Sequence, residues 1–296
     1  RREELVPQLR QNIITGEWVV MAPERAKRPN DYVTADTVRH QSKTDCAFCV
    51  EKNQVYAESI KKYETSHIYV VPNKFPAFVE DGKEEVRSYK VEDGFFRGRP
   101  STGGHDVIVI KDHDVDLPNF SKQIWVEQLE TFKARYQYFD KEKNVAYTMP
   151  IYNHGREAGA SIEHPHSQIF ASNIVPNEIA KELHHTEKYF EHNGICAFCE
   201  LIAHEKKFKT RILFENKDFI AFTFYAARFP FEVWVLPKVH QSRFENEPNS
   251  KFPYLADCLM DIFAKLNKTL NDPPLNFFIH NLPNTITQSD YYHCHL

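Results

Sequence analysis

Four of the six cysteines occur in two identical tetrapeptides, Cys46-Ala47-Phe48-Cys49 and Cys196-Ala197-Phe198-Cys199. The chain starts with the charged stretch 1–4, which lacks the apolar run of an export signal. Such a chain is expected in the cytoplasm, where closely spaced cysteine pairs indicate metal ligands rather than disulfides.

Histidines follow both cysteine pairs at matching distances. In each half an apolar, strand-like run ends near one histidine, His113 or His240. A His-x-His motif begins 51 residues after His113 in the first half and 53 residues after His240 in the second. Zinc prefers thiolate and imidazole ligands in a tetrahedron. The repeat therefore predicts two zinc sites, although iron or another divalent ion can occupy a site of mixed donors, and reduced thiols without metal stay an alternative. The predicted ligands are Cys46, Cys49, His113 and His164 for one site, and Cys196, Cys199, His240 and His293 for the other.

A second histidine in the first His-x-His motif has a different expected role. On a strand, His166 would face the same side as the ligand His164 and gain a rigid support. A neutral imidazole, with its far N–H bound to a backbone carbonyl, could attack phosphorus and form a covalent phosphoramidate. Gln168 could donate to a phosphoryl oxygen, and Ser161 and Ser167 could add donors. The alternative for His166 is a metal ligand or a buried structural histidine; its counterpart His295 is interpreted as a remnant or auxiliary ligand.

The motif around this histidine resembles that of a known family. Gly159-Ala160-Ser161 and His164-Pro165-His166-Ser167-Gln168 are similar to the active-site motif of the galactose-1-phosphate uridylyltransferases, a branch of the histidine-triad superfamily. The segments 15–20 and 23–29 resemble the N-terminal signature of that family. The resemblance implies two fused histidine-triad-like halves, commonly a homodimer, and a ping-pong reaction through a nucleotidylated His166.

The resemblance also implies binding roles for further residues. Arg25 and Arg28 would contact substrate phosphates, which arginine binds through two parallel hydrogen bonds. Asn73 and Phe75 would line the nucleoside pocket, where an aromatic face can pack on a base. Asn153, Ser161 and Gln168 would lie near the phosphates. The alternatives are a solvated arm for the two arginines and a core position for Phe75.

Two departures from the family pattern affect the choice of substrate. Ser167 stands where many uridylyltransferases have glycine, and plant-type relatives that resemble an ADP-glucose phosphorylase share this serine. The family's hexose-contacting segment also lies beyond the last His-x-His motif, so the natural chain is expected to run further.

We expect a UDP-glucose–hexose-1-phosphate uridylyltransferase, whose partners are a nucleotide sugar and a sugar 1-phosphate such as galactose 1-phosphate. The first alternative is an ADP-glucose phosphorylase or adenylyltransferase that uses the same histidine. The second is a non-catalytic, zinc-stabilised nucleotide-binding protein.

Charge and hydropathy exclude two other classes of partner. The formal net charge is −4, so nothing attracts nucleic acid to the molecule as a whole. No apolar run approaches the roughly 20 residues that a membrane helix needs. Neither a nucleic acid nor a membrane is therefore expected as a partner.

The elements that must position these residues predict an α+β fold with antiparallel sheet covered by helices. Two histidine-triad-like halves are expected, residues 1–172 with the active-site motif and residues 173–296. Strands are predicted at 16–21, 67–71, 105–110, 145–152, 167–171, 219–224, 232–237 and 276–280. Helices are predicted at 121–140, 176–191 and 252–270.

Overall fold

The computed structural model describes residues 8–21, 42–49, 62–81 and 100–296. The chain forms two compact units, each assembled from separate stretches of sequence. One unit contains residues 39–176 and 274–287, and the other contains the N-terminal segment to Val38 with residues 177–273 and 288–296. Residues 274–287 thus join the unit of the first half in space. The predicted repeat of two halves with a boundary at 172/173 stays a prediction.

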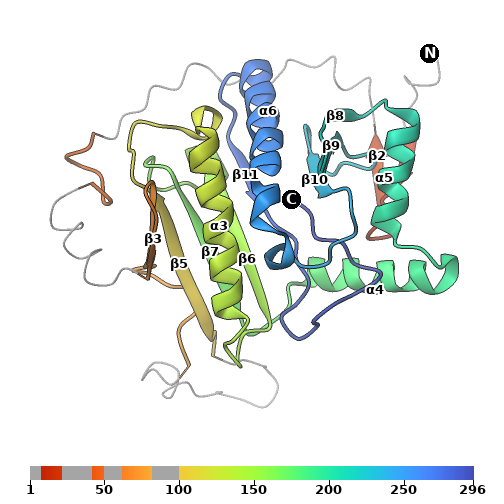
Figure 1. The fold of residues 1–296 in the computed structure, drawn as a ribbon, viewed down its shortest axis with the longest axis horizontal. Helices are drawn as coiled ribbons and strands as arrows, with labels where there is room; N and C mark the ends of the chain where they lie inside the picture. The colour runs from red at the N-terminus through yellow and green to blue at the C-terminus, as the bar shows by residue number, and fades with distance from the viewer. Residues whose placement is uncertain (1–7, 22–41, 50–61, 82–99) are drawn as a thin grey trace. The chain divides into compact units, whose positions relative to one another are not determined.

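The first unit is built on a six-stranded sheet in which every neighbouring pair of strands is antiparallel (Figure 1). The strand order is β11-β6-β7-β5-β4-β3, so β7 lies between β5 and β6 at the centre. The bounds are β3 Tyr63–Glu64, β4 Ile68–Pro72, β5 Gly103–Ile110, β6 Tyr147–His154, β7 His166–Ser172 and β11 Leu275–Phe278.

One long helix, α3 (Lys122–Phe139), packs against strands β4, β6 and β7 of this sheet. Its N-terminus is capped by Ser121, whose hydroxyl accepts a hydrogen bond from the Ile124 N–H at 3.2 Å. Trp125, Leu129 and Phe132 recur at helical spacing and are buried, so the helix covers the sheet with one apolar face.

A buried charge cluster joins this helix to β5. Asp106 is fully buried, and its carboxylate accepts hydrogen bonds from Arg135 Nη2 at 2.7 Å and from Lys62 Nζ at 3.0 Å. The Arg135 guanidinium also lies over the ring of Tyr138, 4.0 Å from its centroid. A carboxylate this deep is stable only with such partners.

We expect Asp106→Ala to lower the free energy of unfolding by about 3–5 kcal/mol, because it leaves the buried Arg135 charge without its partner. Urea titration followed by circular dichroism measures the change. The matched control is Lys62→Met, whose side chain is 23% exposed and whose loss should cost less than about 1 kcal/mol. Equal effects of the two substitutions would contradict the interpretation.

Within its described residues, the second unit contains a two-stranded and a three-stranded antiparallel sheet with three α-helices. The helix α6 packs against β8 and β9 through residues such as Leu255, Leu259 and Ile262. Leu296 exchanges two 2.9 Å backbone hydrogen bonds with Val235 of β10. The bounds are β1 Gln8–Gln11, β2 Trp18–Met21, α4 Asn177–Asn193, α5 Ala197–Phe208, β8 Ile212–Glu215, β9 Phe219–Thr223, β10 Val233–Pro237 and α6 Phe252–Leu270.

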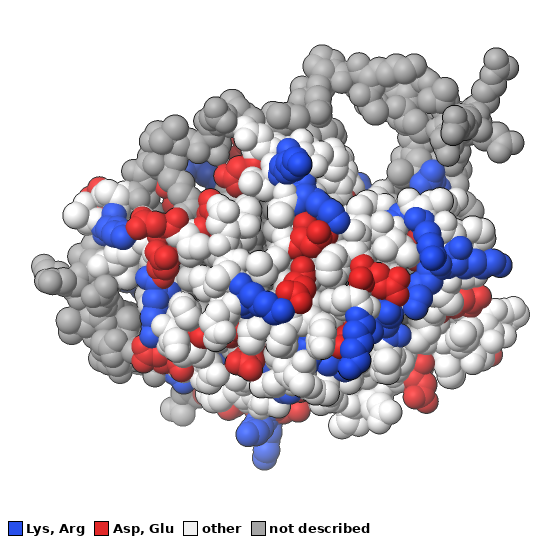
Figure 2. Space-filling model, turned by 45° about the horizontal axis from the view of Figure 1, so that its top comes forward, with Lys and Arg blue, Asp and Glu red and all other residues white. Residues whose placement is uncertain are grey.

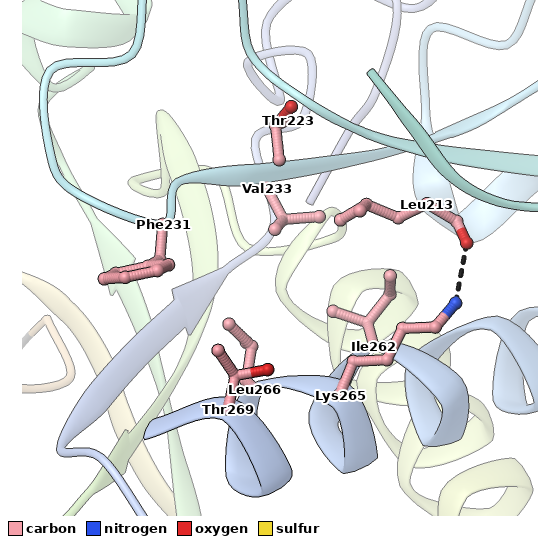
Figure 3. Close-up of a pocket in the computed structure, with 8 residues that line it drawn as sticks. All are labelled: Leu213, Thr223, Phe231, Val233, Ile262, Lys265, Leu266 and Thr269. Carbon is pink, nitrogen blue, oxygen red and sulfur yellow. Dashed lines mark hydrogen bonds between the residues drawn. The ribbon is translucent and has the colours of Figure 1, made fainter. Parts of the chain in front are cut away.

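A shallow hollow between α6 and the three-stranded sheet has mostly apolar walls (Figure 3). The only charged group in its lining, the Lys265 ammonium, donates to the Leu213 carbonyl at 2.7 Å and pairs with Asp261. Its remaining walls offer two hydroxyls, of Thr223 and Thr269, and no titratable group that could act on phosphate. This hollow therefore lacks the groups that a reaction at phosphate would need.

The predicted α+β class, with antiparallel sheets covered by helices, is confirmed. All eight predicted strands and three predicted helices are present, with ends that differ by a few residues. The prediction missed the short strands β1, β3 and β8 and the helix α5. None of the described helices has the length and apolarity needed to cross a membrane. On the face drawn in Figure 2, basic and acidic side chains lie beside one another in mixed groups among uncharged residues.

Candidate active site and metal centres

Two thiols and two imidazoles meet near the ends of the interior strands β5 and β7 of the six-stranded sheet. Cys46 and Cys49 lie in a turn, His113 follows the end of β5, and His164 precedes β7. The Nδ1 atoms of the two histidines are 3.0 Å apart, and Cys49 Sγ lies 3.2 Å and 3.3 Å from them. Cys46 Sγ lies 3.5 Å from His164 Nδ1.

These separations fit a tetrahedral metal ion. Bonds of about 2.0–2.3 Å place neighbouring tetrahedral donors roughly 3.3–3.8 Å apart, and the separations of 3.0–3.5 Å found here are at or slightly below that range. All four predicted donors, from Cys46, Cys49, His113 and His164, lie within 4.8 Å of one another. The structure therefore brings the first predicted ligand set together in a geometry that can hold a metal, in a closed arrangement that suits a structural ion.

The hydrogen bonding of His164 prepares it for this role. Its Nε2–H donates to the Ile110 carbonyl at 2.5 Å, which leaves the Nδ1 lone pair for the metal. Burial lowers the pKa of His164 to about 4, so the ring is neutral at pH 7.

The second cysteine pair lies in a different local structure. Cys196 is the N-cap residue of α5 and Cys199 lies in its first turn, while His240 follows β10. Cys199 Sγ lies 3.3 Å from His240 Nδ1, and His240 Nε2 donates to the Ser289 carbonyl at 2.9 Å. Hydrogen bonds from Cys199 and His240 lower the pKa of Cys196, which favours the thiolate that a metal requires.

The fourth predicted ligand of this centre is arranged less completely. The His293 ring lies 5.2 Å from the His240 ring and nearly perpendicular to it, much as the His113 and His164 rings lie 5.0 Å apart in the first centre. Only Cys196, Cys199 and His240 bring their donor atoms together, however. His293 Nδ1 faces the Cys294 carbonyl at 3.3 Å. Its role as a ligand stays a prediction.

The predicted nucleophile begins the central strand β7. His166 Nδ1–H donates to the His164 carbonyl at 2.8 Å, which confirms the expected hydrogen bond and leaves Nε2 unprotonated. Burial lowers the pKa of His166, so the neutral ring is the form present at pH 7. Phe48, between the two cysteines, contacts both histidines, with its ring 5.4 Å from that of His166 and 5.5 Å from that of His164.

Gln168 lies two residues further along β7, on the same side of the sheet as His166. Its Oε1 accepts hydrogen bonds from His105 Nε2 at 2.8 Å and from Asn73 Nδ2 at 3.3 Å. Ser167 points to the opposite face, where its hydroxyl accepts a hydrogen bond from Gln128 of α3 at 2.5 Å. The expectation that Ser167 adds a donor beside His166 is therefore wrong, because the strand alternates its side chains between the two faces.

The other predicted binding residues occupy polar or exposed positions. Phe75 is 81% exposed, which excludes the core position and leaves its ring accessible. Asn153 of β6 accepts a hydrogen bond from Asn276 of β11 at 2.7 Å. Ser161 is exposed in the loop before β7. Arg25 and Arg28 lie outside the described residues, so their expected phosphate contacts stay a prediction.

Sequence reasoning missed four residues that support these groups: Phe48, His105, Gln128 and Asn276. The available signal for His105 was a polar His-Asp pair at the start of an otherwise apolar strand. Phe48 lies in the repeated tetrapeptide, but the repeat does not show which rings it contacts. Gln128 and Asn276 carry no signal of their own, because their partners are 39 and 123 residues away along the chain.

Residues 1–176 match the family model described as galactose-1-phosphate uridyl transferase, N-terminal domain. The chain is 31% identical to the ADP-glucose phosphorylase of Arabidopsis thaliana, over 99% of this chain and 83% of that protein. It is 29% identical to the galactose-1-phosphate uridylyltransferase of Thermotoga maritima, over 98% of this chain and 85% of that protein. The crystal structure of the A. thaliana phosphorylase with bound ADP-glucose is similar at a TM-score of 0.81, with 29% identity over 98% of this chain and 88% of that one.

Proposed function

Because the chain belongs to the galactose-1-phosphate uridylyltransferase family, we propose that it transfers a uridylyl group between hexose 1-phosphates through His166. The chain is an enzyme of the nucleotidyltransferase type. The observation that carries the proposal is the 2.8 Å hydrogen bond from His166 Nδ1 to the His164 carbonyl, which leaves Nε2 unprotonated, with its lone pair available for attack.

The proposed reaction has two displacement steps at one phosphorus atom. First, His166 Nε2 attacks the α-phosphorus of UDP-glucose; a P–N bond forms, the P–O bond to glucose 1-phosphate breaks, and that phosphate leaves with the electron pair. Second, a phosphate oxygen of galactose 1-phosphate attacks the uridylyl group, the P–N bond breaks, and UDP-galactose is released. No proton has to be supplied to either leaving group, because one is a phosphate and the other is the neutral imidazole.

The neighbouring groups support the charge changes of these steps. The His164 carbonyl accepts the Nδ1–H and stabilises the positive charge that His166 carries once Nε2 is bonded to phosphorus. The Gln168 carboxamide can donate to a non-bridging oxygen as negative charge develops there. The exposed Phe75 ring offers a stacking surface for the base. Asn153 and Ser161 are proposed near the phosphates, together with Arg25 and Arg28.

We further propose zinc at both cysteine-containing centres, with iron as the alternative at one of them. Cys46, Cys49, His113 and His164 would hold the first ion, and Cys196, Cys199, His240 and His293 the second. Each ion would stabilise the local structure and take no part in the reaction, because protein donors would fill all four of its coordination positions. A homodimer and a location in the cytoplasm, where the six unpaired cysteines would stay reduced, complete the proposal.

Adenylyl transfer from ADP-glucose to inorganic phosphate is the second candidate function. It is favoured by the 31% identity to the A. thaliana ADP-glucose phosphorylase and by the similarity to its structure with ADP-glucose. Both reactions use His166 in the same way and differ in the base and in the phosphate acceptor.

Intact-protein mass spectrometry after incubation with UDP-glucose or with ADP-glucose separates the two candidates. We expect a uridylyl adduct that disappears when galactose 1-phosphate is added. An adenylyl adduct that inorganic phosphate removes would favour the phosphorylase. If neither donor modified the protein, His166 would not be a nucleophile and the non-catalytic alternative would stand.

A further inference from the structure

The tautomer of His105, a residue of β5, is fixed by its neighbours. His105 is 7% exposed, and its Nδ1 lies 3.0 Å from the backbone nitrogen of Ala77. A backbone N–H can only donate, so Nδ1 accepts and carries no proton. The single proton of the neutral ring is therefore on Nε2. Burial lowers the pKa of His105, which keeps the ring in this neutral form.

The protonated nitrogen of His105 fixes the orientation of Gln168. Nε2 lies 2.8 Å from Gln168 Oε1, and because Nε2 is the donor, the amide oxygen must face it. Asn73 acts in the same sense, since its Oδ1 accepts the Phe75 N–H at 2.8 Å and its Nδ2 donates to the same Gln168 oxygen at 3.3 Å. Asn73 Nδ2 also lies 3.2 Å from His105 Nε2, but both nitrogens carry protons, so this contact is not a hydrogen bond. With its oxygen held by two donors, the Gln168 carboxamide turns its NH₂ group away from both.

Packing holds the His105 ring where it can do this. The ring lies 4.1 Å from the Phe170 ring and is tilted by 30° to it. Phe170 is on β7, two residues beyond Gln168, so His166, Gln168 and Phe170 share one side of the strand. The His105 carbonyl also accepts the Asn73 N–H at 2.8 Å, which ties the two donors together.

We propose that His105 is a positioning residue for nucleotidyl transfer, which presents the N–H of Gln168, rather than its oxygen, to the phosphoryl group on His166. The proposal rests on the proposed function of His166. A carboxamide rotated by half a turn would direct oxygen lone pairs at an anionic oxygen and replace an attraction by a repulsion. The donor from His105 prevents that rotation, because the rotated amide would bring two N–H donors face to face.

We expect His105→Phe to slow formation of the nucleotidyl-His166 adduct roughly tenfold to hundredfold, since it keeps an aromatic ring against Phe170 but removes the donor. Single-turnover mass spectrometry measures the rate at saturating nucleotide sugar. The nucleotide-sugar concentration that gives half the maximal rate should change less than about threefold, because the lost orientation of Gln168 acts mainly on the transition state. His105→Gln, whose amide can donate to Gln168, should recover most of the rate. Thr148→Val, which alters a buried hydroxyl of the same sheet, should leave the rate unchanged.

A double-mutant cycle tests whether His105 acts through Gln168. In a Gln168→Ala background, His105→Phe should change the adduct rate less than about twofold, because the group that it orients is gone. Independent, multiplying effects of the two substitutions would overturn the proposal. So would a His105→Phe variant with the wild-type rate.

A measurement without substrate separates this inference from the proposed function. Nitrogen-15 spectra of the protein with labelled histidine should show His105 as the Nε2–H tautomer, with a resonance that shifts in Gln168→Ala. An Nδ1–H tautomer would overturn the inference whether or not the protein accepts nucleotide sugars. Absence of any adduct in the wild type, with the Nε2–H tautomer present, would instead remove the proposed function.

Discussion

His166→Ala is expected to abolish nucleotidyl transfer, with a fall in kcat/KM of about four orders of magnitude or more. The substitution removes the nitrogen to which phosphorus becomes bonded, and no other described side chain on this side of β7 carries a neutral imidazole held by a backbone carbonyl. After incubation with the nucleotide sugar, mass spectrometry should detect no nucleotidyl adduct on the protein. Coupled turnover assays should give the residual rate.

The control for this prediction is His184→Ala, which removes an exposed histidine from α4 and should leave the rate unchanged. His166→Ala should keep the metal content of the wild type, because His166 is not among the four grouped donors. A variant that folds, retains its metal and turns over at a tenth or more of the wild-type rate would exclude His166 as the nucleophile.

Removal of the first cysteine pair should have the largest effect on stability. We expect Cys46→Ala/Cys49→Ala to lose one equivalent of metal and about 5 kcal/mol or more of unfolding free energy, because the proposed ion would link the 46–49 turn to the histidines beside β5 and β7. The corresponding fall in Tm is about 10 °C or more. Inductively coupled plasma mass spectrometry and differential scanning calorimetry measure the two changes.

Cys258→Ala is the matched control, since Cys258 is buried in α6 and belongs to neither cysteine-containing centre. It should keep both equivalents of metal. If the double variant loses its metal while its Tm stays at the wild-type value, the first centre is not structural.

The repeat in the sequence predicted the first metal centre because its signal is chemical and does not depend on the path of the chain. The two thiols lie within one tetrapeptide, and the two histidines lie just after or just before strands further along the chain. Such donors can come together in few ways. The strand and helix positions were likewise predicted from local patterns, and the end residues predicted for one helix, Ser121 and Asp140, are the N-cap and C-cap of α3.

Identical local sequence did not fix identical local structure. Cys46–Cys49 forms a turn, whereas the same four residues at Cys196–Cys199 begin the helix α5. After the second pair, Leu201 and Ile202 are buried on the face of α5, and the stretch is rich in helix-forming residues. Motif recognition alone therefore missed α5.

Long-range pairing was also beyond the sequence. The strand β11 pairs with β6 more than 120 residues earlier, and this pairing brings Asn276 to Asn153. The support of Gln168 by His105 likewise needs β5 and β7 to be neighbours in register, with Asp106 opposite Ile169. A pattern along one strand does not state which strand lies beside it, so partners of catalytic groups could not be identified before the sheet order was known.

The side chain of His164 lies in the proposed metal centre, whereas its main-chain carbonyl accepts the hydrogen bond from His166. Every amino acid has the same carbonyl, so the contact that sets the tautomer of His166 places no demand on which residue occupies position 164. Substitution of the metal ligand at position 164, for example of an imidazole by a thiolate, would therefore leave the tautomer of His166 unchanged. Within the tripeptide His164-Pro165-His166, the proposed ligand can thus vary in evolution while the nucleophile is retained.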